Sequence, residues 1–512
     1  MGEKRRRLLG SSIVRMVFVG IAFLFQAGWL LVRVYWLNEY SDVISSLTAV
    51  LALAVVLKLN SKPTNPAMKM PWIMLIMAFP VMGLTMYLLM VILGDPGVGR
   101  RLRRLRREQE RKTPDTARLA YEHLEAGDRS LAGQSRYLWE QAGYPVYENT
   151  LVRHYDEAKD AFEDMKKDLE QAESFIFMEY FIVEDGSAFR EIEQILARKA
   201  AAGVQVRLMY DDLGSVGGAN LRFAKRLREK GIRCVPFNPA IPVLSLFLNH
   251  RDHRKITVID GKVGFTGGYN LADEYFDRCR PYGKWKDTGL RLEGEAVRSL
   301  TEIFLELWRV QTGQTEDDIA YLEVCHSVCA RGFVQPYADN PLEKERVAEN
   351  VYMNLANQAV ATLYFMTPYL IISDELSHAL VLAAKRGVDV RIITPGIPDK
   401  KMVYGVTRSY YGGLAAQGVR IFEYTPGFCH AKQCICDGKV ASVGTSNLDY
   451  RSLYHHFENN VLLSGCVAVD AIAADFERTL AECREVTQTY SSGKGAMLQT
   501  WQYILRLFAP LM

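Results

Sequence analysis

The feature that most constrains the fold of this 512-residue chain is an internal duplication. A strand-like apolar run at residues 175–183 precedes a helical pattern at 188–202 and a second strand pattern at 204–210. The same order returns about 180 residues later, at residues 363–372, 376–386 and 388–394. We therefore expect an α/β protein made of two similar halves, which can build one site at their interface.

Both halves carry the same reactive residues at the same spacing. They are His253, Lys255, Asp260 and Asn270 in the first half and His430, Lys432, Asp437 and Asn447 in the second. A His-x-Lys-x4-Asp pattern should occur by chance about 0.02 times in a chain of this composition. Side chains two apart in a strand share a face, so the histidine and lysine of each motif should project together. The repeat therefore predicts a functional site.

Two imidazoles and two ammonium groups suit phosphoryl chemistry. A neutral imidazole can attack phosphorus while a protonated one assists the leaving oxygen, and the ammonium groups offset charge on the other phosphoryl oxygens. Small or amide-bearing residues should let a phosphate approach closely. These candidates for substrate binding are Gly267, Gly268, Asn270, Ser446 and Asn447. No metal and no cofactor are expected.

The acidic residues leave two interpretations open. Asp260 and Asp437 each precede a glycine, so they are either hairpin-turn residues or catalytic carboxylates that orient a histidine, possibly in the opposite half. Asp287 and Glu458 occupy matching places after the two motifs and are either partners of a histidine Nδ1 or surface carboxylates. The other histidines, including His455 and His456, repeat in no matched position and are interpreted as structural or surface residues.

The first hundred residues predict a membrane anchor. Uncharged apolar runs occupy residues 16–32, 43–57 and 70–94. The charges around them favour two crossings followed by a segment that dips into the membrane without crossing, because Pro71, Pro80 and Gly83 divide the third run. A basic cluster at residues 100–112 should then lie on the cytoplasmic side against anionic headgroups.

Charge and cysteine content narrow the function. Residues 1–112 carry a net charge of +11, whereas the remaining 400 residues carry −8, which argues against a nucleic-acid partner for the catalytic part. The nine cysteines form no CxxC pair and are expected to be free thiols in a reducing compartment. We expect a multi-pass protein of the cell membrane with its catalytic part on the cytoplasmic side.

The sequence resembles the phospholipase D superfamily, and within it the bacterial cardiolipin synthases. The resemblance rests on HRKITVIDGKVGFTGGYN and HAKQCICDGKVASVGTSN, which follow the family's HxK(x)4D(x)6GGxxN pattern, with Gly-Thr-Ser replacing the glycine pair in the second copy. It extends to Thr367-Pro-Tyr369, to Asn447-Leu-Asp-Tyr-Arg451 and to the closing Phe508-Ala-Pro-Leu511. It implies a duplicated phospholipase D-like α/β sandwich whose two pseudo-symmetric halves share one active site, behind an N-terminal helical anchor.

The resemblance also implies a reaction. One phosphatidylglycerol would lose glycerol to form a phosphatidyl-histidine, and a second would attack it to give cardiolipin, with His253 as nucleophile and His430 as acid and then base. The expected partners are therefore phosphatidylglycerol and anionic membrane lipids. Three alternatives stay open: a phospholipase D with water as acceptor, a phosphatidylserine synthase, and a non-catalytic membrane scaffold. The sequence does not rank the two histidines and gives no oligomeric state.

These observations divide the chain into five expected parts. They are the anchor (1–99), a basic juxtamembrane linker (100–144), the first half (145–325), the second half (326–495) and a C-terminal amphipathic segment (496–512).

Overall fold

A computed structural model describes most of the chain after residue 40. The described residues are 41–93, 113–216, 221–239, 250–314, 319–323 and 326–491, with Leu24, Gly28 and Arg506. Most of the first apolar run, the basic cluster at 100–112, and the C-terminal segment except for Arg506 lie outside them. The chain forms two units, one holding the N-terminal helices and the other the two halves.

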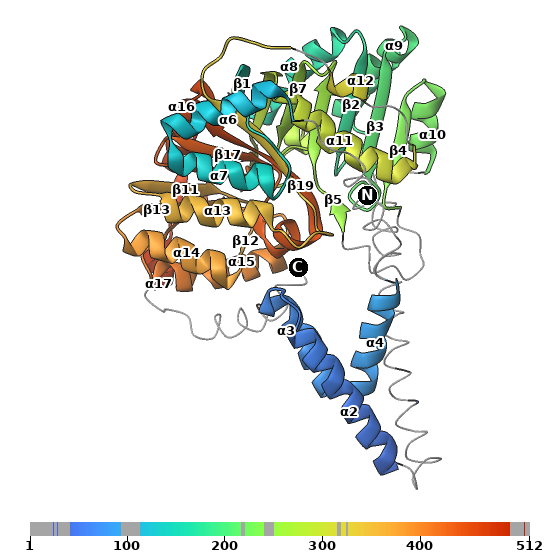
Figure 1. The fold of residues 1–512 in the computed structure, drawn as a ribbon, viewed down its shortest axis with the longest axis vertical. Coiled ribbons are helices and arrows are strands. Elements are labelled where there is room, and N and C mark those ends of the chain that lie inside the picture. The colour runs from blue at the N-terminus through green and yellow to red at the C-terminus, as the bar shows by residue number, and fades with distance from the viewer. Residues whose placement is uncertain are drawn as a thin grey trace. The chain divides into compact units, whose positions relative to one another are not determined.

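The first half is drawn mainly in green and yellow in Figure 1. It is built on a seven-stranded mixed sheet with the strand order β1-β9-β7-β6-β2-β3-β4. The strands are β1 (Thr150–Tyr155), β2 (Phe175–Tyr180), β3 (Gln205–Asp211), β4 (Arg233–Phe237), β6 (Lys255–Ile259), β7 (Val263–Gly267) and β9 (Gly289–Gly294). Every residue of β2 is buried, because helices cover the centre of the sheet. The helices of this half are α8 (Ala158–Glu170), α9 (Ser187–Ala201), α10 (Leu221–Glu229), α11 (Val297–Thr312) and α12 (Ile319–Leu322).

The second half repeats this plan in a larger sheet. Its strand order is β10-β19-β17-β16-β11-β13-β14-β20. The strands are β10 (Phe333–Asp339), β11 (Thr362–Met366), β13 (Asp389–Pro395), β14 (Arg420–Tyr424), β16 (Gln433–Cys436), β17 (Val440–Gly444), β19 (His456–Ser464) and β20 (Cys483–Glu485). The helices are α13 (Val347–Gln358), α14 (Asp374–Lys385), α15 (Lys401–Ala415), α16 (Val467–Ala481) and α17 (Thr487–Ser491), while α6 (Asp115–Gly127) and α7 (Arg129–Glu140) precede β1 in the chain.

The predicted duplication is confirmed down to single turns. The units β2-α9-β3 and β11-α14-β13 have the same order and the same parallel pairing. The glycines that follow the two helices, Gly203 and Gly387, both have φ of +94°, the left-handed conformation that glycine adopts most readily. The second copy differs where Pro368 interrupts the expected run 363–372, which splits into β11 and the short β12 (Leu370–Ile371).

Two short parallel ladders join the halves. In the first, β5 (Arg251–Asp252) of the first half pairs with β19 of the second. In the second, β15 (Gly427–Cys429) of the second half pairs with β8 (Lys284–Lys286) of the first. Each half therefore adds the segment just before its own motif histidine to the other half, and the two motifs meet at one interface.

In the part of the N-terminal unit that the structure describes from residue 41 on, the helices are α2 (Ser41–Asn60), α3 (Pro66–Ala78) and α4 (Pro80–Leu93). The run at 70–94 breaks between Ala78 and Pro80, as expected, but Pro71 lies inside α3 and Gly83 inside α4, so the expected divisions at these two residues are wrong. A Cβ at Gly83 would lie 2.6 Å from Ile76 Cα, so glycine permits the close approach of α4 to α3. Large apolar side chains remain exposed, among them Leu47, Val50, Leu57, Met74 and Leu88. Within the described residues, no helix combines the length and apolarity needed to cross a membrane. The number of crossings stays a prediction.

Candidate active site

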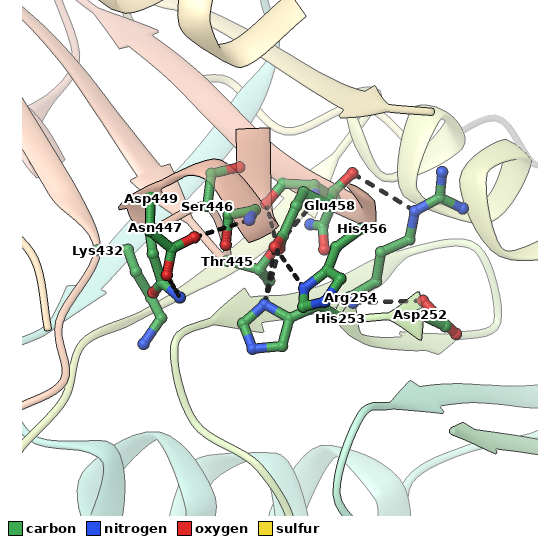
Figure 2. Close-up of polar contacts among 12 residues, drawn as sticks. Asp252, His253, Arg254, Lys432, Thr445, Ser446, Asn447, Asp449, His456 and Glu458 are labelled. Atoms are coloured by element: carbon green, nitrogen blue, oxygen red, sulfur yellow. Dashed lines mark hydrogen bonds and ion pairs between the residues drawn. The ribbon is translucent and has the colours of Figure 1, made fainter. Parts of the chain in front are cut away.

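The first half of the site is centred on His253. Its backbone N–H donates to Phe457 O at 2.9 Å, which continues the β5–β19 ladder. Its Nδ1 lies 2.9 Å from both carboxylate oxygens of Glu458, more than 200 residues away in the sequence and completely buried on β19 (Figure 2). Since the carboxylate accepts the Nδ1 proton, the neutral ring keeps a lone pair on Nε2, the atom that a nucleophile or base needs.

The second motif repeats this arrangement with the halves exchanged. The backbone N–H of His430 donates to Lys286 O at 2.7 Å, and its Nδ1 lies 2.6 Å from Asp287 Oδ2. Asp287 is completely buried and follows β8 of the first half. Each motif histidine is thus held by a carboxylate from the opposite half, and neither half contains both members of a pair.

The two lysines lie beside their histidines in the same buried site. The Nζ of Lys255 donates to His253 O, and the Nζ of Lys432 donates to His430 O. Lys432 Nζ also lies 2.8 Å from His430 Nδ1. Both lysine side chains are almost fully buried, so their charges act at short range with little screening by water. The site therefore offers two fixed cations to a phosphodiester.

Burial sets the protonation of this cluster. Desolvation, followed by the nearby lysines, holds the pKa values of both His253 and His430 well below their ordinary value. Desolvation lowers the pKa of Lys255 to about 7 and that of Lys432 to about 8, although Glu458 and Asp287 oppose it. Both imidazoles are consequently neutral in the free site, and an arriving phosphodiester anion would favour protonation of the cluster.

The aspartates of the two motifs, Asp260 and Asp437, bind backbone N–H groups and not the motif histidines. The Asp260 carboxylate accepts from the backbone N–H groups of Glu173, Ser174 and Phe175, each at 2.8 Å. Asp437 does the same for residues 360–362 at 2.7–2.9 Å. Both sit in left-handed turn conformations, with φ of +52° and +51°. The alternative in which they orient a histidine is therefore replaced by the hairpin-turn interpretation, because all three donors come from the chain entering β2 or β11.

The small residues also differ from the expectation of an open phosphate cradle. A Cβ at Gly268 would lie 2.0 Å from Asp287 Oδ1, and one at Gly267 would lie 2.4 Å from Thr288 O. Glycine is therefore needed so that the carboxylate can reach His430. The matching residue of the second half is Thr445, whose hydroxyl donates to Glu458 instead. This difference explains the departure from the glycine pair in the second motif.

The predicted amide and hydroxyl ligands divide into occupied and free groups. Asn270 accepts from Ile182 N at 3.0 Å and donates to Tyr275 Oη at 2.7 Å, so its amide positions the loop. Ser446 Oγ accepts from Asn460 Nδ2 at 2.7 Å. Asn447 Oδ1 is buried and has no hydrogen-bond partner among the described residues. Asn447 thus retains a polar atom for a ligand.

Comparisons with known proteins show the family of the chain. A family described as "Cardiolipin synthase, PLD-like domain" matches residues 165–308 and 352–480, and one described as "Phospholipase_D-nuclease N-terminal" matches residues 47–90. The chain is 32% identical over 501 residues to a cardiolipin synthase of Halalkalibacterium halodurans, covering 95% of this chain and 97% of that one. The chain belongs to the phospholipase D-like cardiolipin synthase family.

One further relative and one solved structure are also similar to the chain. An uncharacterized protein of Streptococcus mutans is 42% identical over 86% of this chain and 96% of its own length. The crystal structure of a phosphatidylserine synthase of Haemophilus influenzae matches with a TM-score of 0.54 at 15% identity, covering 70% of this chain and 93% of that one. That likeness concerns the fold alone.

Within this phospholipase D-like architecture, the interpretation of His456 as structural or surface overlooked its place in the site. His456 is only 6% exposed, and its ring centroid lies 5.4 Å from that of His253. The sequence could have indicated this position, because His456-Phe-Glu458 matches Trp285-Lys-Asp287 position by position. The Trp285 ring likewise lies 5.4 Å from the His430 ring. Lys400 was also overlooked, although its charge lowers the pKa of both motif histidines.

The turn interpretation of the motif aspartates predicts a stability effect. Asp260→Ala should lower the free energy of unfolding by roughly 3 kcal/mol, because three backbone donors lose their acceptor. Turnover per folded molecule should fall by less than about tenfold, since the side chain does not touch a histidine. Denaturant unfolding of the variant, alongside its specific activity, checks both values. A stable but inactive Asp260→Ala protein would restore the catalytic interpretation.

The lysine pKa values predict the basic limb of the pH profile. Raising the pH removes the ammonium protons of Lys255 and Lys432 in the free enzyme, so the affinity for an anionic phosphodiester should fall. We expect kcat/KM to decline above pH 7–8. Lys432→Arg should reduce the maximal rate and make the decline above pH 8 less steep, because a guanidinium stays charged while Lys255 still loses its proton. An identical basic limb in Lys432→Arg would remove Lys432 from that titration.

Proposed function

We propose that this chain is a membrane phosphatidyltransferase that makes cardiolipin and glycerol from two molecules of phosphatidylglycerol. The observation that carries the proposal is the exchange of carboxylates between the halves, which gives two oriented imidazoles and two ammonium groups in one buried site. The cardiolipin synthase relatives, matched over nearly their full length, point to a glycerol-bearing lipid as the acceptor.

In the first half-reaction, His253 Nε2 attacks the phosphorus of phosphatidylglycerol. The bond from phosphorus to the glycerol oxygen breaks, and His430, which takes up a second proton on Nε2 when the anionic lipid binds, gives that proton to the oxygen, so glycerol leaves and a phosphatidyl-histidine remains. Lys255 and Lys432 offset charge on the non-bridging oxygens. Glu458 stabilises the positive charge that develops on the attacking ring.

In the second half-reaction, a second phosphatidylglycerol binds with its terminal hydroxyl towards phosphorus. His430, now neutral, takes the hydroxyl proton as the new oxygen–phosphorus bond forms. The phosphorus–nitrogen bond to His253 breaks, which releases cardiolipin and restores both histidines. A single neutral and a single protonated imidazole thus serve both steps by exchanging roles.

The remaining assignments are part of the same proposal. Residues 1–99 would anchor the protein, with residues 100–144 as a basic linker and the catalytic halves at 145–325 and 326–495 on the cytoplasmic side. The segment 496–512 would dock on the bilayer or against the anchor. The exposed apolar side chains of α2, α3 and α4 support membrane contact. The acidic balance of residues 113–512 supports a lipid rather than a nucleic acid as partner.

The test is a product analysis with purified full-length protein. Labelled phosphatidylglycerol in mixed micelles should yield cardiolipin and an equal amount of free glycerol. Added serine should leave the products unchanged. Phosphatidic acid alone would indicate water as the acceptor, and phosphatidylserine in the presence of serine would indicate the corresponding synthase; either result would overturn the proposal.

A further inference from the structure

A third imidazole, that of His456, lies beside the proposed nucleophile His253 and makes no hydrogen bond to the described residues. The side chain of His456 is buried, with an exposed fraction of 6%. Neither ring nitrogen has a hydrogen-bond partner among the described residues. Its Nδ1 lies 3.7 Å from Glu458 Oε1, too far for a hydrogen bond. A buried polar side chain without a partner is costly, which points to a ligand that completes the group.

The neighbours of His456 are the groups that a zinc-like cation binds. Ligand atoms of His253, His456 and Glu458 all lie within 4.8 Å of one another (Figure 2). Two imidazole nitrogens and one carboxylate oxygen are a recurrent ligand set for Zn²⁺, with a fourth position left for water. Tetrahedral bonds of the usual length separate neighbouring ligand atoms by about 3.3 Å, so small side-chain adjustments suffice.

We propose that His253, His456 and Glu458 form a binding site for a divalent cation of the zinc type, and that its occupancy stops turnover. The inhibitory part of this inference rests on the proposed function; the binding part does not. The matching position in the other half is Trp285, which has no ligand atom for a cation. Among the described residues, this set of ligands therefore occurs in one half and not at the matching place in the other.

Inhibition follows from the position of one proton. In the metal-free site, His253 donates its Nδ1 proton to Glu458 and keeps a lone pair on Nε2. A cation on Nδ1 displaces that proton, and the neutral ring then carries its single proton on Nε2. A protonated Nε2 cannot attack phosphorus and cannot act as a base, so a histidine in either catalytic role is disabled.

Binding is tested on the full-length protein after treatment with a chelator. Equilibrium dialysis should show a bound Zn²⁺ that requires His456, and Co²⁺ should give the absorption of a tetrahedral site. His456→Phe keeps the ring but loses the ligand, and should weaken binding by at least about a hundredfold, since even outer partners cost ~10–100-fold. His455→Phe is the matched control and should bind like the unaltered protein.

Turnover provides the second readout. The rate of His456→Phe should be the same with and without Zn²⁺, whereas the unaltered protein and His455→Phe should be inhibited and recover with chelator. X-ray absorption of the zinc-loaded protein, which needs no variant, should show two imidazoles and a carboxylate. Failure to bind Zn²⁺ or Co²⁺, or equal binding by His456→Phe, would overturn the inference. If the protein makes no cardiolipin but binds the cation through His456, only the proposed function fails.

Discussion

Replacing either His253 or His430 with alanine is expected to remove nearly all turnover. The two imidazoles act as a unit, because bond formation at phosphorus and proton transfer to the leaving oxygen occur in the same step. We expect kcat to fall by about 10³-fold or more in each single variant, and the double variant to lose little more, since such losses do not add.

Steady-state release of glycerol from phosphatidylglycerol measures this effect. Each variant should show the unfolding transition of the unaltered protein, which separates lost chemistry from lost folding. His378, on α14 and outside the two motifs, offers a control substitution that should leave kcat unchanged. More than about a tenth of the activity remaining in either motif variant would rule out a shared site, because one half would then be acting alone.

Replacing Glu458 with glutamine is expected to be nearly as damaging, although the side chain does not touch phosphorus. The amide group has the same size but can donate a proton to His253 Nδ1, which forces the ring proton onto Nε2. That tautomer has no lone pair for attack. In the Ser-His-Asp triads of serine proteases, replacing the orienting carboxylate by an amide lowers kcat by about 10⁴-fold.

The matching change, Asp287→Asn, tests the same relation at His430. We expect both variants to lose at least about a hundredfold in kcat with a much smaller change in KM, because orientation acts on the chemical step. Glu458→Asp, which keeps the charge, should recover part of the activity. A Glu458→Gln enzyme within tenfold of the unaltered rate would show that the carboxylate has only a structural role.

Much of the architecture could be predicted because the duplication is recorded locally. The strand, helix and glycine pattern around Gly203 returns around Gly387, and short-range sterics dictate the same turn in both places. The motif spacing likewise places each lysine two residues after its histidine. Lys255 is the first residue of β6, and Lys432 directly precedes β16. Sequence periodicity is sufficient for features of this kind.

The cross-half contacts could not be predicted in the same way. The pairs His253–Glu458 and His430–Asp287 join residues 205 and 143 positions apart, and they depend on the ladders β5–β19 and β15–β8. These ladders are too short to give a periodic signal. The role of Asp260 was ambiguous for a related reason, because a carboxylate before glycine suits a turn and a site equally well until its three donors are known.

His456 could not be found from the repeated motifs. A search for residues repeated in both halves discards it, since its counterpart is Trp285. Its burial against His253 follows from the strand pairing of His456 with Arg251, and only the three-dimensional arrangement reveals it. Differences between the halves of a duplicated site are therefore as informative as the shared residues.

The central claim, one site with a covalent intermediate on His253, is tested most directly by trapping. Phosphatidylglycerol labelled in its acyl chains is mixed with the His430→Ala variant, quenched in denaturant at alkaline pH and digested. We predict label on the peptide that contains His253, and none on the protein in the His253→Ala variant. Label on the peptide that contains His430 in the His253→Ala variant, with none in His430→Ala, would contradict the account.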